Sequence, residues 1–162
     1  VRVGPQFGEI YDHHYVEFTY DDAAIMNSQC RHQRRCMNRV NEFVRGTKGS
    51  AGAGIIYDND GKVAWRFEGK KKNPYQVEHD ELYRHIREDL PINNAYYGAQ
   101  STMSAIFGRM ATYSGKALKL NKALASDIKL VPEELGWDVL PGPKVGEDGL
   151  YPCAIPGKTK VY

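Results

Sequence analysis

Residues 55–67 read IIYDNDGKVAWRF, in which two strand-like runs flank a tight turn. The runs 55–57 and 63–67 are rich in β-branched and aromatic residues, which favour strands. Between them, Asp58-Asn-Asp-Gly61 supplies the positive backbone angles that a short antiparallel hairpin requires. The stretch therefore predicts a hairpin within an antiparallel sheet.

More strands are predicted on the N-terminal side of this hairpin. Polar and apolar residues alternate from His14 to Tyr20, Asp21-Asp22 offers a turn, and an extended pattern resumes from Ala24 to Arg31. Residues 11–32 therefore predict a second hairpin. A further strand is predicted from Val40 to Gly46, and the glycine-rich residues 46–54 predict a flexible or bulged connection between strands.

On the C-terminal side, the apolar spacing changes to three and four residues, which is typical of helices. One helix is predicted to open at Asn73-Pro74 and to end by Pro91. A longer helix is predicted between a cap at Asn93 or Asn94 and Gly115. Its predicted apolar face holds Ala95, Ala99, Met103, Ile106, Met110 and Tyr113. Its opposite side holds Gly98, Ser101, Ala105, Gly108 and Thr112, which are small enough to allow a close neighbour.

Strands followed by helices predict an α+β fold, with an open, mostly antiparallel sheet and helices packed on one face. We expect residues 1–130 to form this domain and a short helix, capped by Asn121, to run from about Asn121 to Ser126. Five of the eight prolines lie beyond Val131, where regular structure is unfavourable. Trp137 and its apolar neighbours make the segment too apolar for a free tail. Residues 131–162 are therefore predicted to form an extended arm packed on the domain or on a neighbouring subunit.

Composition excludes some classes of partner. The 22 Lys and Arg residues nearly balance the 20 Asp and Glu residues, and the net charge of +2 gives no support for a nucleic-acid partner. No stretch approaches the roughly 20 apolar residues that span a bilayer, so no membrane partner is predicted. Three cysteines are too few for a disulfide framework.

Two motifs resemble ligand-binding sites, and each also has a structural explanation. Cys30, His32 and Cys36, with His13 or His14, suggest zinc, but their spacing matches no standard site and a fourth ligand is missing, so no metal is predicted. Residues 46–54 resemble a phosphate-binding loop, but they lead into a predicted strand rather than into a helix N-terminus. No cofactor-binding residue is therefore predicted.

The adjacent residues His13 and His14 should point to opposite faces of their strand, so at most one of them can face a given pocket. A titratable imidazole in a cleft can move protons near neutral pH. The alternative is that both are hydrogen-bonded, partly buried structural residues.

Several longer stretches are similar to a known family. They are residues 4–20 (GPQFGEIYDHHYVEFTY), 46–49 (GTKG), 73–82 (NPYQVEHDEL), 97–116 (YGAQSTMSAIFGRMATYSGK) and 151–157 (YPCAIPG). They resemble the C-terminal part of Gfo/Idh/MocA-family oxidoreductases of a bacterial subgroup, and the resemblance covers nearly the whole chain.

The resemblance implies a parent protein of two domains. Its N-terminal Rossmann domain would bind NAD or NADP, and its C-terminal sheet would help to form the substrate pocket and the oligomer interface. The implied reaction is hydride transfer between the nicotinamide and a sugar, inositol or related polyol. Some relatives are exported with a twin-arginine signal, so the resemblance leaves the cytoplasm and export both open.

This chain lacks the family's Rossmann glycine fingerprint, its Glu-Lys-Pro motif and its Asp-x-x-x-His catalytic segment. We therefore expect no catalytic residue in this chain and no cofactor bound to it alone. The expected partners are a Rossmann domain absent from this chain and a second copy of the chain that contacts it through the sheet. His13, His14, Arg31 and His32 are the candidates for lining the substrate pocket. The alternatives are a free-standing binding or interaction module and a metal-dependent enzyme built on Cys30 and His32.

Overall fold

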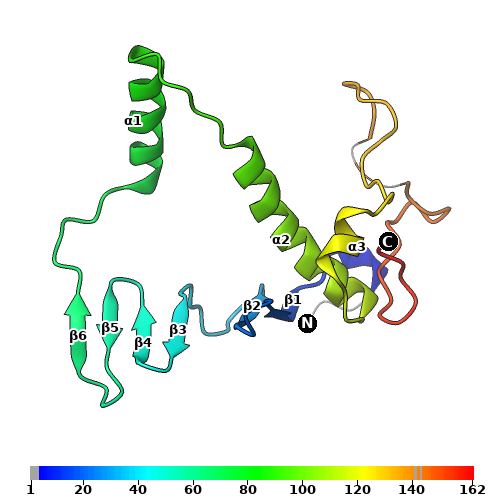
Figure 1. Ribbon diagram of the computed structural model, residues 1–162. Helices are drawn as coiled ribbons and strands as arrows, with labels where there is room; N and C mark the ends of the chain where they lie inside the picture. Colours follow the sequence, from blue (N-terminus) through cyan, green and yellow to red (C-terminus); the bar gives the residue numbers. More distant parts are fainter. Residues whose placement is uncertain (1–3, 141, 143) are drawn as a thin grey trace. The chain divides into compact units, whose positions relative to one another are not determined.

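The computed structural model describes residues 4–140, 142 and 144–162, and the chain divides into two compact units (Figure 1). Unit 1 joins the described residues up to Arg34 to Asn94–Tyr162, and unit 2 is Arg35–Asn93. Unit 1 holds η1 (Pro5–Phe7), β1 (His13–Thr19), β2 (Ile25–Arg31), α2 (Ala95–Ser114) and α3 (Leu120–Leu124). Unit 2 holds β3 (Phe43–Gly46), β4 (Gly49–Gly52), β5 (Ile55–Tyr57), β6 (Val63–Arg66) and α1 (Pro74–Arg87). The α+β class with antiparallel strands is confirmed, and the strands form one sheet of two strands and one of four.

The first sheet is the predicted hairpin of residues 11–32. β1 and β2 pair antiparallel, from His13 opposite Arg31 to Thr19 opposite Ile25. Exposure alternates along β1, with His14, Val16 and Phe18 half-buried and the residues between them exposed. The period-two pattern in the sequence therefore identified the packed face correctly.

α2 lies against this face of β1 through its small residues. A Cβ at Gly108 would lie 3.1 Å from Phe18 Cζ and 3.7 Å from Val16 Cγ2, so glycine permits the close approach. One turn later Thr112 Oγ1 lies 2.9 Å from His14 Nδ1. The prediction that this side of the helix accommodates a close neighbour is confirmed for these two positions.

A larger side chain at Gly108 should separate α2 from β1. Gly108→Val is expected to destabilise unit 1 by about 1–3 kcal/mol, the usual cost of overpacking. Hydrogen exchange of the α2 amides is a suitable readout because both tryptophans, Trp65 and Trp137, lie outside this contact. Gly98→Val in the same helix is the matched control, since a Cβ there would meet nothing within 4 Å. Equal effects at the two glycines would contradict this account of the packing.

The other side of α2 faces the C-terminal segment. Met110 and Tyr113 are buried, whereas Ile106 is 44% exposed and the predicted apolar face is uncovered in the first turns. α2 ends at Gly115, which has the left-handed conformation expected of a helix C-terminus (φ 65°). Its predicted C-terminus is therefore confirmed.

Residues 131–162 contain no helix or strand in the part that the structure describes. Their last portion returns to the end of α2, where Gly157 N donates to Ser114 O (2.6 Å) and Tyr11 Oη donates to Ala154 O (2.7 Å). The preceding short helix, α3, begins after Lys119. Asn121 lies inside it, so the predicted cap at Asn121 is wrong.

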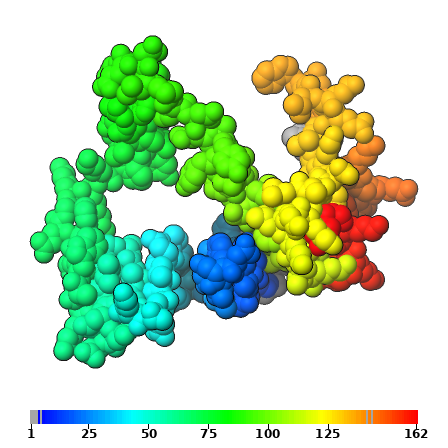
Figure 2. Space-filling view, in the orientation of Figure 1, coloured from blue at the N-terminus to red at the C-terminus, as the bar shows by residue number. Residues whose placement is uncertain are grey.

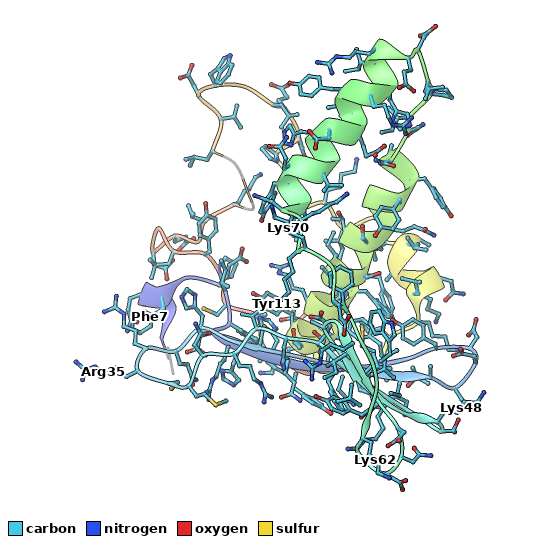
Figure 3. All side chains as sticks on the ribbon, turned by 90° about the vertical axis from the view of Figure 1, so that its left-hand side faces the viewer. Phe7, Arg35, Lys48, Lys62, Lys70 and Tyr113 are labelled. Carbon is cyan, nitrogen blue, oxygen red and sulfur yellow. The ribbon has the colours of Figure 1, made fainter. Side chains whose placement is uncertain are left out.

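Unit 2 contains a meander in which β3, β4, β5 and β6 follow one another in space. The hairpin at residues 55–67 is confirmed, with a register irregularity at Ile56 and Tyr57. Figure 3 shows Lys62 at its tip, where the lysine side chain is 78% exposed. The predicted strand from Val40 is shorter, since it begins at Phe43.

The glycine-rich residues 46–54 were expected to be a connection, and this expectation is wrong because Gly49–Gly52 form β4. Glycine is required at Gly49, where φ is 146° and a Cβ would collide with the carbonyl oxygen of Tyr57 on the neighbouring strand. Low strand propensity is here outweighed by the close approach of two backbones.

No residue of unit 2 is buried. α1 begins where predicted, with Asn73 Oδ1 accepting from Tyr75 N (3.0 Å). It has no buried residue, and its Tyr83 and Ile86 side chains are exposed. On the sheet, Trp65 and Phe67 are about half exposed. Small sheets and single helices gain stability mainly by packing, and unit 2 has little of the buried surface that provides it. No described helix is long and apolar enough to cross a membrane.

Candidate functional site

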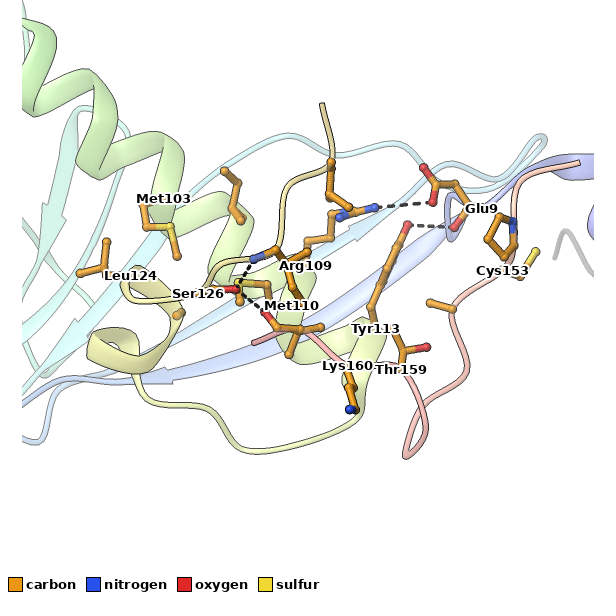
Figure 4. A pocket seen from close by; sticks show the side chains of 17 residues that line it. Glu9, Met103, Arg109, Met110, Tyr113, Leu124, Ser126, Cys153, Thr159 and Lys160 are labelled. Carbon is orange, nitrogen blue, oxygen red and sulfur yellow. Dashed lines mark hydrogen bonds and ion pairs between the residues drawn. The ribbon is translucent and has the colours of Figure 1, made fainter. Parts of the chain in front are cut away.

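A pocket lies in unit 1, between α2, α3 and the C-terminal segment (Figure 4). Its volume is about 510 Å³, within the range of roughly 300–1000 Å³ that is usual for ligand sites. α2 supplies Met103, Ile106 and Met110 to its wall, and Leu124 of α3 adds another apolar side chain. The pocket is therefore suited to apolar groups, and its methionines can adapt to different shapes.

Few charged groups line the pocket. Arg109 lies over the ring of Tyr113, with 4.3 Å between the guanidinium carbon and the ring centroid. The same arginine faces Glu9, with 3.9 Å between Nη2 and Oε2, while Tyr113 Oη donates to the backbone oxygen of Glu9 (3.0 Å). Lys160 also lines the pocket and makes no ion pair with another described residue. The lining therefore carries two cations against one carboxylate.

The C-terminal wall of the pocket is held in place by hydrogen bonds. Ser126 Oγ donates to Val161 O (3.3 Å), and Cys153 Sγ lies 3.3 Å from Gly8 O. Tyr11 binds Ala154 O, and burial raises the pKa of Tyr11, with nearby Tyr113 and Cys153 raising it further. The Tyr11 hydroxyl therefore keeps its proton and its role as a donor throughout the neutral range.

His13 and His14 lie on opposite faces of β1, as predicted. His13 is exposed, and its Nδ1 lies 2.6 Å from Oδ1 of Asp12, whose side chain is only 4% exposed. A buried carboxylate at Nδ1 orients the imidazole and favours the tautomer whose Nε2 can accept a proton. His13 therefore has the partner that a general base requires.

His14 has a different environment. Its ring stacks on Tyr113, with 6.1 Å between centroids and 14° between planes, and its Nδ1 is bonded to Thr112. Both contacts tie β1 to α2. His14 therefore fits the alternative of a hydrogen-bonded, partly buried structural histidine.

Arg31 and His32 lie at the same end of the hairpin. Arg31 is the cross-strand partner of His13, and the backbone of His32 donates to Asp12 O (2.7 Å). Both side chains are exposed. The structure thus brings the backbones of all four sequence-predicted residues together, with His13 and Arg31 sharing one face.

Cys30, Cys36 and Cys153 are exposed and form no disulfide with one another. Within the described part of the chain, no group of three or more His, Cys, Asp or Glu side chains is arranged to hold a metal ion. Cys30 lies across the strand pair from His14.

The pocket was not predicted from the sequence. Its α2 wall was identified as an apolar helix face, but its other wall comes from residues 152–161, which have no periodicity to identify what they contact. Asp12 was also missed, because a single Asp before a strand carries no signal that it will be buried.

Comparison of the chain with known proteins finds no matching family model, no similar curated protein and no similar solved structure.

Proposed function

We propose that this chain is the substrate-side and assembly part of an NAD(P)-dependent oxidoreductase that acts on a sugar, an inositol or a related polyol. The reaction class comes from the resemblance to the Gfo/Idh/MocA family. The Rossmann domain that holds the nicotinamide would belong to the same protein or to a partner.

The observation that carries the proposal is the pairing of exposed His13 with buried Asp12, next to Arg31. Oxidation of an alcohol removes a proton from the hydroxyl as hydride leaves its carbon, so a polyol site needs a proton acceptor close by. The sequence predicted no catalytic residue in this chain, but His13 Nε2 has that capacity, and a guanidinium offers several donors to neighbouring hydroxyl groups. These residues would bind and orient the polyol, while hydride transfer requires the separate cofactor domain.

The chain alone is expected not to bind NADH or NADPH. Pyrophosphate binding needs a glycine-rich turn that opens a helix, whereas Gly54 leads directly into β5. Titration of the chain with NADH, followed by fluorescence or calorimetry, should show no saturation. Saturable binding at micromolar NADH would contradict the prediction.

The function itself is tested on the product of the complete reading frame that contains this chain. We expect that frame to encode a strand, a G-x-G-x-x-G turn and a helix, followed by Glu-Lys-Pro, upstream of Val1. The purified product should reduce NAD or NADP with at least one member of a panel of sugars and inositols. His13→Ala should lower kcat/KM for that substrate by about 10²–10⁴-fold, as expected for loss of a proton acceptor.

His79→Ala is the matched control, because His79 is exposed on α1 and its Nδ1 bonds only locally, to Tyr75 O at 2.6 Å. A reading frame without the nucleotide-binding motifs would contradict the proposal. Equal effects of the two histidine substitutions would remove His13 from the substrate site.

The second candidate is a free-standing binding module. It is favoured by the pocket, whose described walls all come from unit 1 and need no second domain. A reading frame that ends near this chain, together with saturable binding of apolar ligands to the pocket, would support this candidate over the first.

A further inference from the structure

The arm carries an apolar segment whose largest side chains are exposed among the residues that the structure describes. Within residues 131–140, Leu135 is 86% exposed, Trp137 is 104% exposed and Leu140 is 74% exposed. Figure 2 shows this orange segment standing clear of the rest of the C-terminal region. Leaving such side chains in water costs about 25 cal/mol for each Å² of apolar surface. We call residues 131–140 the arm segment.

The pocket has the properties that this segment requires. Its cavity of about 510 Å³ has room for an indole ring, and its methionine and leucine walls offer apolar contact. Large aromatic side chains in such pockets commonly dominate the affinity of an interface. Trp137 is therefore a large exposed apolar side chain that suits the size and the apolar lining of the pocket.

Charge also matches. The arm segment contains Glu133, Glu134 and Asp138 and no lysine or arginine. The pocket lining contains Arg109 and Lys160 against the single carboxylate of Glu9. Opposite charges around an apolar contact speed association and fix its orientation.

The segment and the pocket are also joined by the chain. Leu130 precedes the protruding part of the arm and Pro152 follows it, and both residues line the pocket. Trp137 lies seven positions after Leu130, a length of chain that can span at most about 25 Å, enough for the arm to fold back. The arm nevertheless stands out with Trp137 in solvent, which favours a pocket on another copy as its receptor.

We propose that two copies of this chain exchange arms, with Trp137 of each copy inserted into the pocket of the other. The exchange is reciprocal, so one patch on each copy serves as its own complement under two-fold symmetry. The inference deepens the assembly role proposed above by naming the contact that carries it.

The test uses cysteines at the two ends of the proposed contact. One chain carries Cys30→Ser and Cys36→Ser, which leaves Cys153 in the pocket wall as its single thiol. A second, differently tagged chain carries these substitutions with Cys153→Ser and Val139→Cys, two residues from Trp137. Mild oxidation of the mixture should give a disulfide-linked heterodimer with both tags. The same pair with Trp137→Ala in the second chain should give much less of it.

A single chain that carries both Cys153 and Val139→Cys tests the alternative in which the arm fills the pocket of its own chain. Loss of its free thiols at monomer mass would show that the arm fills its own pocket and would overturn the exchange. Absence of the disulfide-linked heterodimer from the two-chain mixture would also overturn it.

Trp137→Ala alone should raise the dimer dissociation constant at least about 30-fold, the loss expected for an interface anchor. Val145→Ala, in the same arm but outside the arm segment, is the control and should change it less than about twofold. If Trp137→Ala leaves dimerisation unchanged, the arm exchange fails while an assembly role through the sheets survives. If the unmodified chain is monomeric at every concentration, both fail.

Discussion

Replacement of Tyr113 by alanine is expected to destabilise unit 1 by about 3–5 kcal/mol, as is usual for a buried aromatic residue. Tyr113 is 5% exposed and joins three parts of the unit. Its ring contacts those of Tyr11 and His14, Arg109 lies over it, and its hydroxyl binds Glu9 O. Native-state hydrogen exchange at the α2 amides should register the loss.

Tyr97→Ala in the same helix is the matched control, because Tyr97 is 74% exposed. It should change the same free energy by less than about 0.5 kcal/mol, as surface substitutions usually do. Similar effects at the two tyrosines would show that unit 1 has no core at this point. Tyr113→Phe isolates the hydroxyl and should cost about 0.5–1.5 kcal/mol.

Gly115→Val is the second substitution with a large expected effect. The left-handed backbone (φ 65°) costs a side-chain-bearing residue about 1–2 kcal/mol. In addition, a Cβ at this position would lie 2.8 Å from Pro156 Cβ and 3.3 Å from its Cα, which adds about 1–3 kcal/mol of overpacking. The C-terminal segment should therefore detach from α2, and the amide of Gly157 should lose its protection from exchange.

Gly8→Ala separates the two contributions. Gly8 also has a positive φ (80°), but a Cβ there would meet nothing within 4 Å. It should therefore show only the backbone cost. A Gly115→Val effect no larger than that of Gly8→Ala would mean that Pro156 does not hold the segment against α2.

Local patterns in the sequence predicted most of the elements. Alternation in β1, the Asp-Asn-Asp-Gly turn and the cap at Asn73 each act within a few residues, so the chain around them suffices to specify the structure. β4 escaped prediction because Gly49 is required by the close approach of Tyr57 on another strand, which is a tertiary requirement.

The candidate site was predictable only in part. The four residues His13, His14, Arg31 and His32 follow from the hairpin register, which the turn position fixes. The burial of Asp12 and the wall formed by residues 152–161 depend on contacts between segments far apart in sequence, such as Tyr11 with Ala154. Period and composition carry no information about such contacts.

We expect the chain to assemble with a second copy, because unit 2 has no buried residue and the arm leaves Trp137 in water. Sedimentation equilibrium of the chain over a range of micromolar concentrations tests it most directly. We expect the mass in solution to depend on concentration and to rise toward twice the 18.3 kDa of one chain. A constant mass of 18.3 kDa at all concentrations would contradict it.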